Sequence, residues 1–344
     1  MKGKRFIIPI FISHFGCPYR CVYCDQHRIA RPASALPSPE EVRKEIEWYL
    51  RVGVRKRRDV RTIQVAFYGG SFTALAQETQ EGLLHSIAPF LREGRVHSLR
   101  LSTRPDYISP EIMEVLKTNK VTTVELGVQS MDDEVLKTSR RGYGREEIKR
   151  AIWELNQRGF EVGVQLMVGL PGDTPEKFSS TIEEVIGIKP HFVRIYPTLV
   201  IKGTVLERWF HEGRYRPISL EEAVNITKGA LQRFRQAQIP VIRVGLQPTP
   251  SLETKGTIVA GPYHPAFRQL VEGSILYEQA ASLLASSRTE ERSSPIFLLS
   301  PQDISNFYGQ GRRNIKRLKE AFGLKEVKVQ TDPKRERGTI SLCV

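Results

Sequence analysis

Cysteine is scarce in this sequence, and long apolar segments are absent. Only four cysteines occur among 344 residues, and three of them lie between positions 17 and 24, whereas a secreted disulfide scaffold spreads an even number along a short chain. The apolar run Phe6–Ile12 follows basic residues as in a secretory signal, but it has only about seven residues and no small-residue cleavage site follows it. No stretch approaches the roughly 20 apolar residues of a membrane helix. We therefore expect a soluble, cytoplasmic protein with no membrane partner.

Acidic residues are few relative to basic ones. The 38 Asp and Glu residues face 52 Lys and Arg residues, which gives a net charge of +14. Such an excess favours polyanions through long-range attraction and counterion release, so nucleic acid is one candidate partner. A generally basic protein without a polyanion partner is the other interpretation, and charge alone does not separate the two.

Apolar, strand-like segments alternate regularly with segments of helical periodicity. Strands are expected at 6–13, 62–67, 98–102, 123–128, 161–168 and 192–196. Helices are expected at 39–51, 77–92, 109–118, 144–158, 175–187 and 219–237. Six β-then-α units in series predict an α/β fold, a partial (β/α)6 barrel with parallel strands and right-handed crossovers. An open doubly wound sheet is the competing architecture, which the lack of a Gly-rich dinucleotide fingerprint after the first strand disfavours.

The polar, apolar-poor stretch at 285–295 predicts a linker. It divides the chain into a barrel with a C-terminal extension (1–284) and a small basic module (296–344). In the module we expect a strand at 296–299, a basic helix at 312–321, a strand at 326–330 and a last strand at the C-terminus. An α+β unit of roughly fifty residues needs to dock on the rest of the chain to be stable.

The sequence CPYRCVYC places Cys17, Cys21 and Cys24 directly after the first predicted strand. Thiolates are soft ligands suited to iron–sulfur clusters or zinc. A structural zinc site needs four ligands, and His14 or His27 could supply the fourth. Three cysteines on a four-iron cluster would instead leave one iron open to a small molecule.

The C-x3-C-x2-C loop after the first strand of a βα series resembles that of radical S-adenosylmethionine (SAM) enzymes. The segments FYGGSF (67–72), STRPDY (102–107), VELGVQS (124–130), RRGY (140–143), GLPGDT (169–174) and VRIYPTLVIKGT (193–204) follow in order. Together they resemble the radical SAM domain of the Elongator catalytic subunit and its bacterial relatives over about residues 6–250. Fewer than a hundred residues follow Gln247, so we do not expect the acetyltransferase domain of that subunit in this sequence.

The resemblance implies a [4Fe–4S] cluster on Cys17, Cys21 and Cys24, with SAM on the open iron. It also implies SAM contacts at Tyr23, Gly69, Gly70, Ser71, Ser102, Gln129, Arg141 and Gln165. Tyr23 would lie against the adenine, the Gly-Gly-Ser segment would meet the methionine amino group, and the remaining polar residues would contact the ribose and carboxylate. Ser102 stands where the relatives usually have Glu, and Gln165 stands where oxygen-independent coproporphyrinogen oxidase, a more distant relative, has Asp. Both differences remove a carboxylate. No catalytic residue is assigned.

The C-terminal stretch ISNFYGQGRRNIKRLKEAFGLKEVKV resembles a KH-type RNA-binding core, in which a GXXG loop clamps nucleotides against a helix start. Arg312 replaces the second glycine of that loop. The predicted RNA contacts are Gly309, Arg312, Arg313, Lys316, Arg317 and Lys319. A solvated basic helix is the alternative interpretation, and the basic run Arg55–Arg61 either extends the basic surface or forms an exposed loop.

The resemblance thus implies an enzyme that cleaves SAM reductively to a 5′-deoxyadenosyl radical, with flavodoxin or ferredoxin as external electron donor, and that modifies RNA, most simply tRNA. The same chemistry on a small molecule or a protein is the first alternative. The second is a non-enzymatic RNA-binding protein with a structural metal at the cysteines.

Overall fold

A curved sheet of seven parallel strands forms the main body of the protein. The computed structural model describes residues 4–18, 20–29, 35–54, 60–287 and 294–343. The strands of this sheet are β1 (Lys4–Phe11), β2 (Val60–Tyr68), β3 (Ser98–Thr103), β4 (Val121–Gln129), β5 (Glu161–Val168), β6 (Phe192–Pro197) and β8 (Val241–Val244). Their spatial order is their chain order, and each neighbouring pair is parallel. Because the order never reverses, the sheet is a partial barrel and not a doubly wound sheet, as the sequence predicted.

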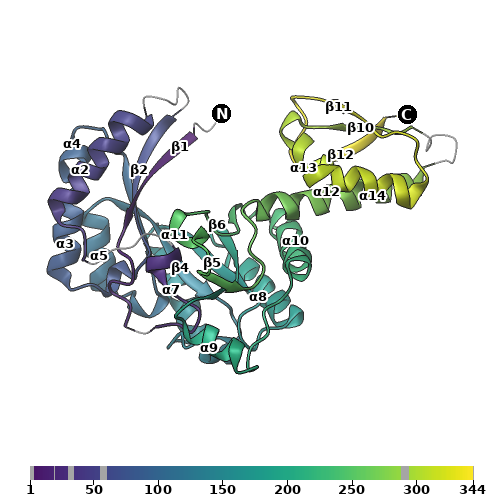
Figure 1. Ribbon diagram of the computed structural model, residues 1–344. Coiled ribbons are helices and arrows are strands. Elements are labelled where there is room, and N and C mark those ends of the chain that lie inside the picture. The colour runs from purple at the N-terminus through teal and green to yellow at the C-terminus, as the bar shows by residue number, and fades with distance from the viewer. Residues whose placement is uncertain (1–3, 19, 30–34, 55–59, 288–293, 344) are drawn as a thin grey trace.

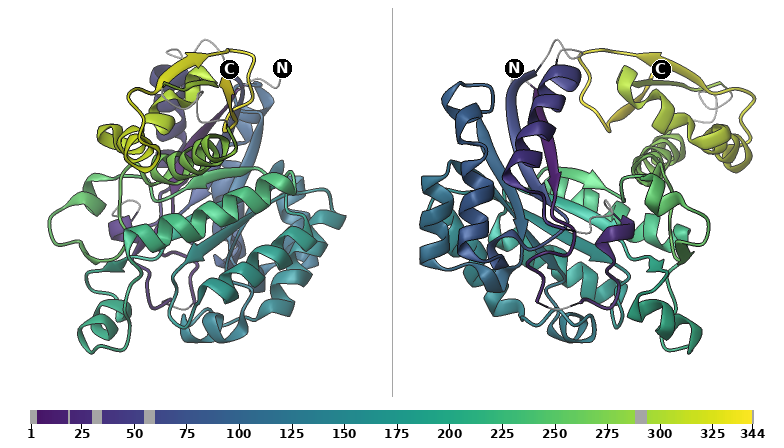
Figure 2. Two further views of the ribbon diagram at one scale, coloured as in Figure 1. Left: turned by 90° about the vertical axis from the view of Figure 1, so that its right-hand side faces the viewer. Right: turned by 60° about the vertical axis from the view of Figure 1, so that its left-hand side comes forward.

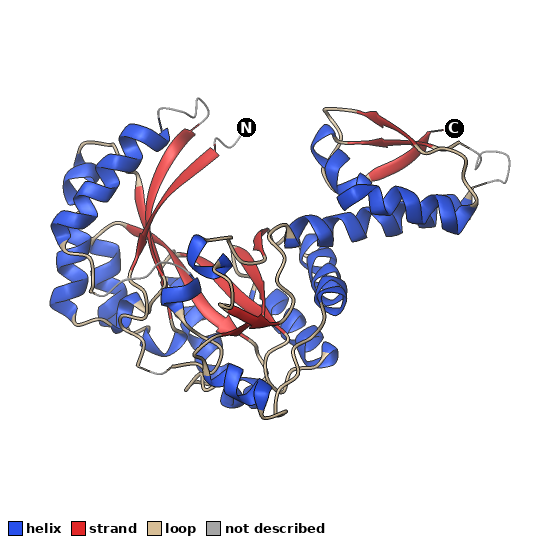
Figure 3. Cartoon of the chain, in the orientation of Figure 1, coloured by secondary structure: helices blue, strands red, loops and turns tan. Residues whose placement is uncertain are grey.

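Helices cover the outer side of this sheet, as Figure 3 shows. They are α2 (Pro39–Tyr49) with its π-helical extension η1 (Leu50–Val54), α3 (Gln77–His85), α4 (Ala88–Arg92), α5 (Pro110–Thr118), α6 (Asp133–Thr138), α7 (Arg145–Gln157), α8 (Pro175–Ile188) and α10 (Leu220–Gln236). Ser38, Ser109 and Thr174 cap three of them, each followed by proline, and each side-chain oxygen accepts a backbone N–H of the first turn. Proline at the first helical position loses no hydrogen bond there.

The main core lies between the sheet and these helices. Ile8, Ile10, Val65, Leu99 and Val164 are fully buried in it. Every residue of β4 except Thr122 is buried, as expected for a strand that is covered on both faces. The core therefore fixes the curvature of the sheet and the positions of the strand ends.

Short elements follow the C-terminal ends of the strands and surround the concave side. They are α1 (Gln26–Ile29), η2 (Phe72–Ala74), η3 (Pro105–Tyr107), β7 (Val200–Ile201), α9 (Val205–His211), α11 (Pro250–Glu253) and β9 (Ile258–Ala260), which pairs antiparallel with β7. Functional groups in such folds belong at this edge.

The C-terminal module is built on one long helix, α12 (Phe267–Ser286). It continues with β10 (Ile296–Leu299), η5 (Pro301–Asp303), α13 (Ile304–Tyr308), η6 (Gln310–Arg312), α14 (Arg313–Phe322), β11 (Lys328–Thr331) and β12 (Ile340–Cys343). β10 is the central strand, parallel to β11 and antiparallel to β12. Figures 1 and 2 show α12 leaving the main body and running under the module.

The structure differs from the sequence prediction at three places. The expected helix 77–92 is two helices, because Pro89 lacks the N–H that would bond the carbonyl of His85. A seventh strand, β8, was not predicted. The expected linker 285–295 begins inside α12, which continues to Ser286, and residues 288–293 lie outside the described residues. Within the described part of the chain, none of the helices combines the length and apolar character needed to cross a bilayer.

Candidate active site

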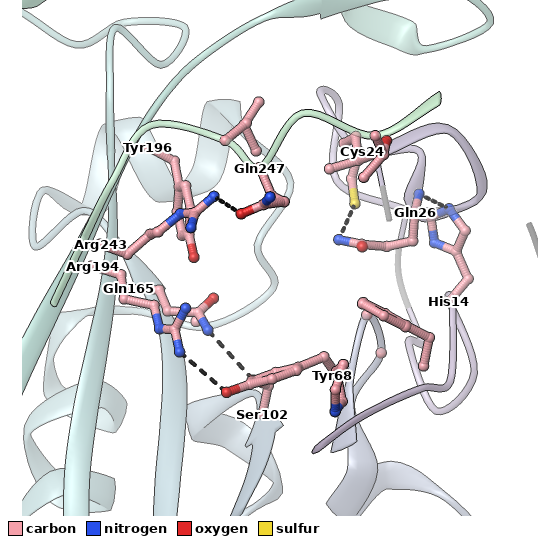
Figure 4. A pocket seen from close by; sticks show the side chains of 18 of the residues that line it. His14, Cys24, Gln26, Tyr68, Ser102, Gln165, Arg194, Tyr196, Arg243 and Gln247 are labelled. Atoms are coloured by element: carbon pink, nitrogen blue, oxygen red, sulfur yellow. Dashed lines mark hydrogen bonds between the residues drawn. The ribbon is translucent and has the colours of Figure 1, made fainter. Parts of the chain in front are cut away.

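The concave side of the sheet holds a cavity of about 1050 Å³. Along β1 the side chains alternate: Ile8 and Ile10 enter the core under the helices, whereas Ile7, Pro9 and Phe11 line the cavity. The cavity brings together the predicted cluster ligands and every predicted SAM contact: Cys17, Cys21, Cys24, Tyr23, Gly69, Gly70, Ser71, Ser102, Gln129, Arg141 and Gln165. Figure 4 shows part of this lining. Residues from five successive strands, or from the connections that follow them, thus converge on one site.

The cysteine loop is held against the turn that follows β2. His14 and Gly16 have positive φ angles of 62° and 74°, which turn the chain sharply before Cys17. The His14 N–H donates to Gly69 O at 2.8 Å, and the Ser71 N–H donates to Phe15 O at 3.0 Å. The two loops are therefore one packed unit.

The three thiols are free and each has a polar neighbour. Cys17 Sγ lies 3.3 Å from Ser71 Oγ, and Gln26 Nε2 donates to Cys24 Sγ at 3.5 Å. Burial raises the pKa of both Cys17 and Cys24, so the apoprotein keeps these two thiols protonated at neutral pH. Binding a metal cluster there releases protons, because the ligand is the thiolate.

The arrangement fits a multi-iron cluster better than a single zinc ion. A zinc ion needs four donors that converge to about 2.0–2.3 Å. Across the described ranges, no three His, Cys, Asp or Glu side chains are grouped closely enough to hold one ion. His14 Nε2 instead accepts the Gln26 N–H at 2.7 Å, so its lone pair is already used. A four-iron cluster takes each thiolate on a different iron and requires no such convergence.

Gly70 has no room for a side chain. A Cβ added to it would lie 2.4 Å from Phe15 O and 2.5 Å from Ile12 O, both backbone atoms of the cysteine loop. Since neither carbonyl can move without moving that loop, the absence of a side chain sets the contact between the two loops.

Gly70→Ala is expected to destabilise the protein by about 1–3 kcal/mol, the usual cost of overpacking, because backbone must shift. Gly82→Ala, in α3, is the matched control, since nothing lies within 4 Å of the added Cβ. That control should gain about 0.5–1 kcal/mol from helix propensity. Denaturant midpoints of the two variants measure the difference. Equal midpoints would show that the two loops are not tightly coupled.

Arg141 joins the cysteine loop to the end of β4. Its Nη1 donates to Cys21 Sγ at 2.9 Å and to Tyr23 OH at 3.2 Å, and its Nη2 donates to Gly127 O at 2.6 Å. Its Nε donates to Tyr143 OH at 2.7 Å. Burial raises the pKa of Tyr143 to about 12, so its hydroxyl stays neutral beside the guanidinium. Arg141 is thus a fixed, buried positive charge that faces the thiols.

Gln129 enters the cavity through an unusual backbone turn. Its φ is 69°, and the β4–β5 register shifts between Leu126 and Gln129. A left-handed conformation at a non-glycine residue is strained, and such strain is typical of functional positions. A Cβ on Gly127 would lie 3.0 Å from Gln129 Nε2 and 3.1 Å from an Arg141 nitrogen, so this glycine makes room for both side chains.

Glu125, to which the sequence analysis gave no role, organises the floor of the cavity. The carboxylate is fully buried and accepts from Arg100 at 2.7 Å, Arg194 at 2.9 Å, Tyr68 at 3.1 Å and Gln165 at 3.1 Å. Burial opposes its ionisation, but Arg194 and Arg100 outweigh this effect and hold the pKa of Glu125 below its usual range. The side chains around it are thereby fixed in orientation.

Ser102 and Gln165, the two positions that depart from the relatives, are linked to each other. Gln165 Nε2 donates to Ser102 Oγ at 3.4 Å as well as to Glu125. Both side chains line the cavity, and neither brings a carboxylate to it. Their contacts with SAM remain predictions.

The wall formed by β6 and β8 carries further polar side chains that the sequence analysis gave no role. Tyr196 and Arg194 come from β6, Arg243 comes from β8, and Gln247 follows β8. Figure 4 shows them across the cavity from Cys24, Gln26 and His14. Polar residues at the ends of parallel strands face the site, so the sequence could have indicated the two residues of β6. The residues on and after β8 could not be found in this way, because that strand was not predicted.

A curved parallel sheet with three cysteines after its first strand defines a class of metal-cluster enzymes. Residues 11–185 match the Radical SAM superfamily, and residues 190–276 match the Radical_SAM C-terminal domain. The first match spans half of the chain, and the protein belongs to the radical SAM superfamily. Membership implies SAM and a [4Fe–4S] cluster as cofactors.

Proteins of similar sequence show which members of the superfamily this chain resembles. The chain is 29% identical over 248 residues to an uncharacterized protein of Methanocaldococcus jannaschii, covering 68% of this chain and 73% of the relative. It is 31% identical over 240 residues to the tRNA uridine(34) acetyltransferase of Dehalococcoides mccartyi, covering 61% of this chain and 52% of the relative. The chain thus spans about half the length of that acetyltransferase.

The solved structure of Methanocaldococcus infernus Elp3 shares the fold. Its TM-score is 0.61 at 24% identity, over 80% of this chain and 63% of that chain. The resemblance to the radical SAM domain of Elongator, predicted from the ordered motifs, is confirmed.

Proposed function

We propose that the cavity holds a [4Fe–4S] cluster on Cys17, Cys21 and Cys24 with SAM beside it, and that the enzyme modifies RNA, with tRNA as the substrate class. The observation that supports the site is the convergence of the three thiols and all the predicted SAM contacts on one cavity. When bound, the cluster would supply the electron for reductive cleavage of SAM to methionine and a 5′-deoxyadenosyl radical, and that radical would abstract a hydrogen atom from the substrate. Flavodoxin or ferredoxin is the proposed source of the electron.

The residues of the chain bind and orient these groups. The thiols of the cysteine loop ligate the irons, and Arg141 holds the loop through Cys21 while it offsets thiolate charge. The turn at Gly69, Gly70 and Ser71 lies against the same loop and presents backbone groups and a hydroxyl to the methionine part of SAM. The curved sheet forms one side of the cavity, and excluding water from this site would protect a radical.

RNA as the substrate class is supported by the C-terminal module. A helix–turn–helix, α13–η6–α14, stands between the strands β10 and β11, as the predicted KH-like core requires. The turn has positive φ at Gly309, Gly311 and Arg312. Glycine is favoured at position 309, because its φ is 68° and a Cβ would lie 3.0 Å from the Asn314 side chain. The loop therefore has the compact geometry that a nucleotide-clamping turn needs.

The basic surface of the module, defined by Arg312, Arg313, Lys316, Arg317 and Lys319, is accessible to a polyanion. No ion pair joins any of these five side chains to a carboxylate in the described parts of the chain. Two of them instead stack on rings: Arg312 lies 5.6 Å from the Tyr308 ring centre and Arg317 lies 4.0 Å from that of Tyr277. Unpaired cations beside aromatic rings are typical of surfaces that bind single-stranded RNA. Of the basic run Arg55–Arg61, residues 55–59 lie outside the described residues.

Replacing Arg312, Arg313 and Lys316 by alanine is expected to weaken tRNA binding by at least about tenfold at low salt. Three lost phosphate contacts should also lower the slope of log affinity against log salt by about 2, since each contact contributes about 0.7 on single strands. Filter binding or fluorescence anisotropy across a salt series measures both quantities.

The matched control removes three exposed cations from the outer helices: Lys117, Lys137 and Arg150 to alanine. It lowers the net charge equally and should leave the slope nearly unchanged. If both triple variants behave alike, binding follows net charge and the module has no specific role.

The function itself is tested by anaerobic assembly with iron and sulfide, followed by reduction and addition of SAM. Formation of 5′-deoxyadenosine that bulk tRNA stimulates supports both parts of the proposal. Formation that is indifferent to tRNA keeps the SAM chemistry and moves the substrate to a small molecule or a protein. A folded, colourless protein that binds zinc and cleaves no SAM would refute the proposal.

A further inference from the structure

The cavity is unbalanced in charge. Among the described residues that line it there are six arginines and no aspartate or glutamate. The arginines are Arg5, Arg20, Arg104, Arg141, Arg194 and Arg243. SAM brings a carboxylate but also an ammonium and a sulfonium, so its net charge is positive and does not compensate such a wall. A cavity of this composition favours a ligand with negative charge.

Three of the six arginines have a carboxylate partner that does not line the cavity, and a fourth, Arg141, is bonded to the thiol of Cys21. Ion pairs or hydrogen bonds join Arg5 to Glu161 at 3.0 Å, Arg104 to Asp106 at 2.8 Å, Arg141 to Cys21 at 2.9 Å and Arg194 to Glu125 at 2.7 Å. Arg20 is exposed on the cysteine loop, where solvent compensates its charge.

Arg243 is the exception, because it is half-buried and has neither a carboxylate nor a thiol partner within the part of the chain that the structure describes. Its Nε donates to Gly245 O at 3.2 Å and its Nη2 donates to Gln247 Oε1 at 2.5 Å, whereas its Nη1 makes no hydrogen bond to a described residue. Burial lowers the pKa of Arg243, and the nearby Arg194 lowers it further. The chain therefore holds a cation in an unfavourable environment with donors unused.

Arg243 lies on the side of the cavity opposite the proposed cluster ligands. Arg243 lies on β8, at one edge of the curved sheet, and β1 with the cysteine loop lies at the other edge. Figure 4 shows Arg243 and Gln247 across the cavity from Cys24 and His14. A ligand between the two sides would therefore meet the cysteine loop at one end and this guanidinium at the other.

We propose that Arg243, oriented by Gln247, binds a phosphate group that flanks the nucleotide entering the cavity, on the side opposite the cysteine loop. This inference rests on the proposed RNA substrate. The planar guanidinium presents donors in a fork that matches phosphate oxygens. Tyr196 lines the same wall and adds a hydroxyl and a ring next to the anion. Arg243 is thus a specificity-determining residue, with no part in SAM cleavage.

The experiment compares binding of uridine 3′,5′-bisphosphate, which carries both phosphates that flank a nucleoside in RNA, with binding of uridine. The protein is the reconstituted holoenzyme with SAM present. We expect the bisphosphate to bind on the order of tenfold more tightly, since hydrogen bonds to a charged group are strong. Arg243→Gln should bring the two ligands within about twofold, and Arg243→Lys should retain part of the difference because it keeps the charge.

Arg268→Gln is the matched control. Arg268 lies on α12, pairs with Glu272 at 2.7 Å and does not line the cavity. It should preserve the preference for the bisphosphate. Arg243→Gln should still bind SAM with the affinity of the unmodified protein, which damage to the fold would not allow.

The outcomes are separable. A bisphosphate preference that persists in Arg243→Gln, or that is absent in the unmodified protein, overturns the phosphate subsite. Loss of SAM binding in Arg243→Gln also overturns it, because the residue then serves SAM or the fold. A preference that depends on Arg243, in a protein whose SAM cleavage no RNA stimulates, supports the subsite and refutes the RNA substrate.

Discussion

Cys21→Ala is expected to abolish the four-iron cluster and to reduce 5′-deoxyadenosine formation to background while the chain stays folded. Cys21 supplies one of three proposed ligands, and alanine has no donor atom to replace it. The side chain is small and lies in a satellite core with Val22, Tyr23 and Leu170, so the loss of stability should stay near 1 kcal/mol. Iron and sulfide content, visible absorbance and product formation under anaerobic conditions measure the effect.

Cys343→Ala is the control for this variant. Cys343 lies in β12 of the C-terminal module, apart from the cavity lining, and should be replaceable without loss of iron. A full four-iron cluster in Cys21→Ala, or an equal loss of iron in both variants, would contradict the ligand assignment.

Glu125→Ala is expected to destabilise the protein by about 3–5 kcal/mol. Removing one partner of a buried ion pair leaves the other charge uncompensated, and here Arg194 loses its carboxylate while Arg100 keeps only the longer contact to Glu161 at 3.8 Å. The pKa of Glu125 is depressed in the folded state, so its contribution is present above its ordinary pKa and is lost as the pH falls through the lower folded-state value. The gap between wild type and variant should therefore narrow on acidification below about pH 4.

Glu47→Ala is the control, because Glu47 makes a two-pronged pair with Arg95 at 2.8 and 2.6 Å on the surface. An exposed pair contributes less than about 1 kcal/mol. Urea unfolding of both variants at pH 7 and at several acidic values gives the comparison. Equal destabilisation would show that the buried carboxylate does not hold the cavity floor together.

The sequence predicted those parts of the fold that local pattern determines. The strand at 161–168 is found at those bounds, because a mostly apolar segment ends at Gly169, which has a positive φ of 77°. The cluster ligands and SAM contacts were predicted from motif order, and the structure brings them to one cavity because parallel strands all end at the same edge.

Features that depend on distant partners were not predicted. Glu125 is one acidic residue within an apolar strand. Its structural role depends on its ion pairs with Arg100, 25 residues away, and Arg194, 69 residues away. The strand β8 is four residues long, with Ile242 exposed at the open edge, so its pattern is weak. Arg243 gains its significance only from the cavity that β8 completes.

The helix α12 connects the main body rigidly to the C-terminal module, because its residues belong to the cores of both. Phe267, Val271 and Ile275 belong to the main core, whereas Leu276, Ala280 and Leu284 belong to the core of the module. One uninterrupted helix of 20 residues rises about 30 Å, and its hydrogen bonds resist bending. The module is therefore held rigidly, and its basic surface keeps a fixed distance and angle to the cavity. If RNA binds both, as proposed, the enzyme would select it by its folded dimensions as well as by its sequence.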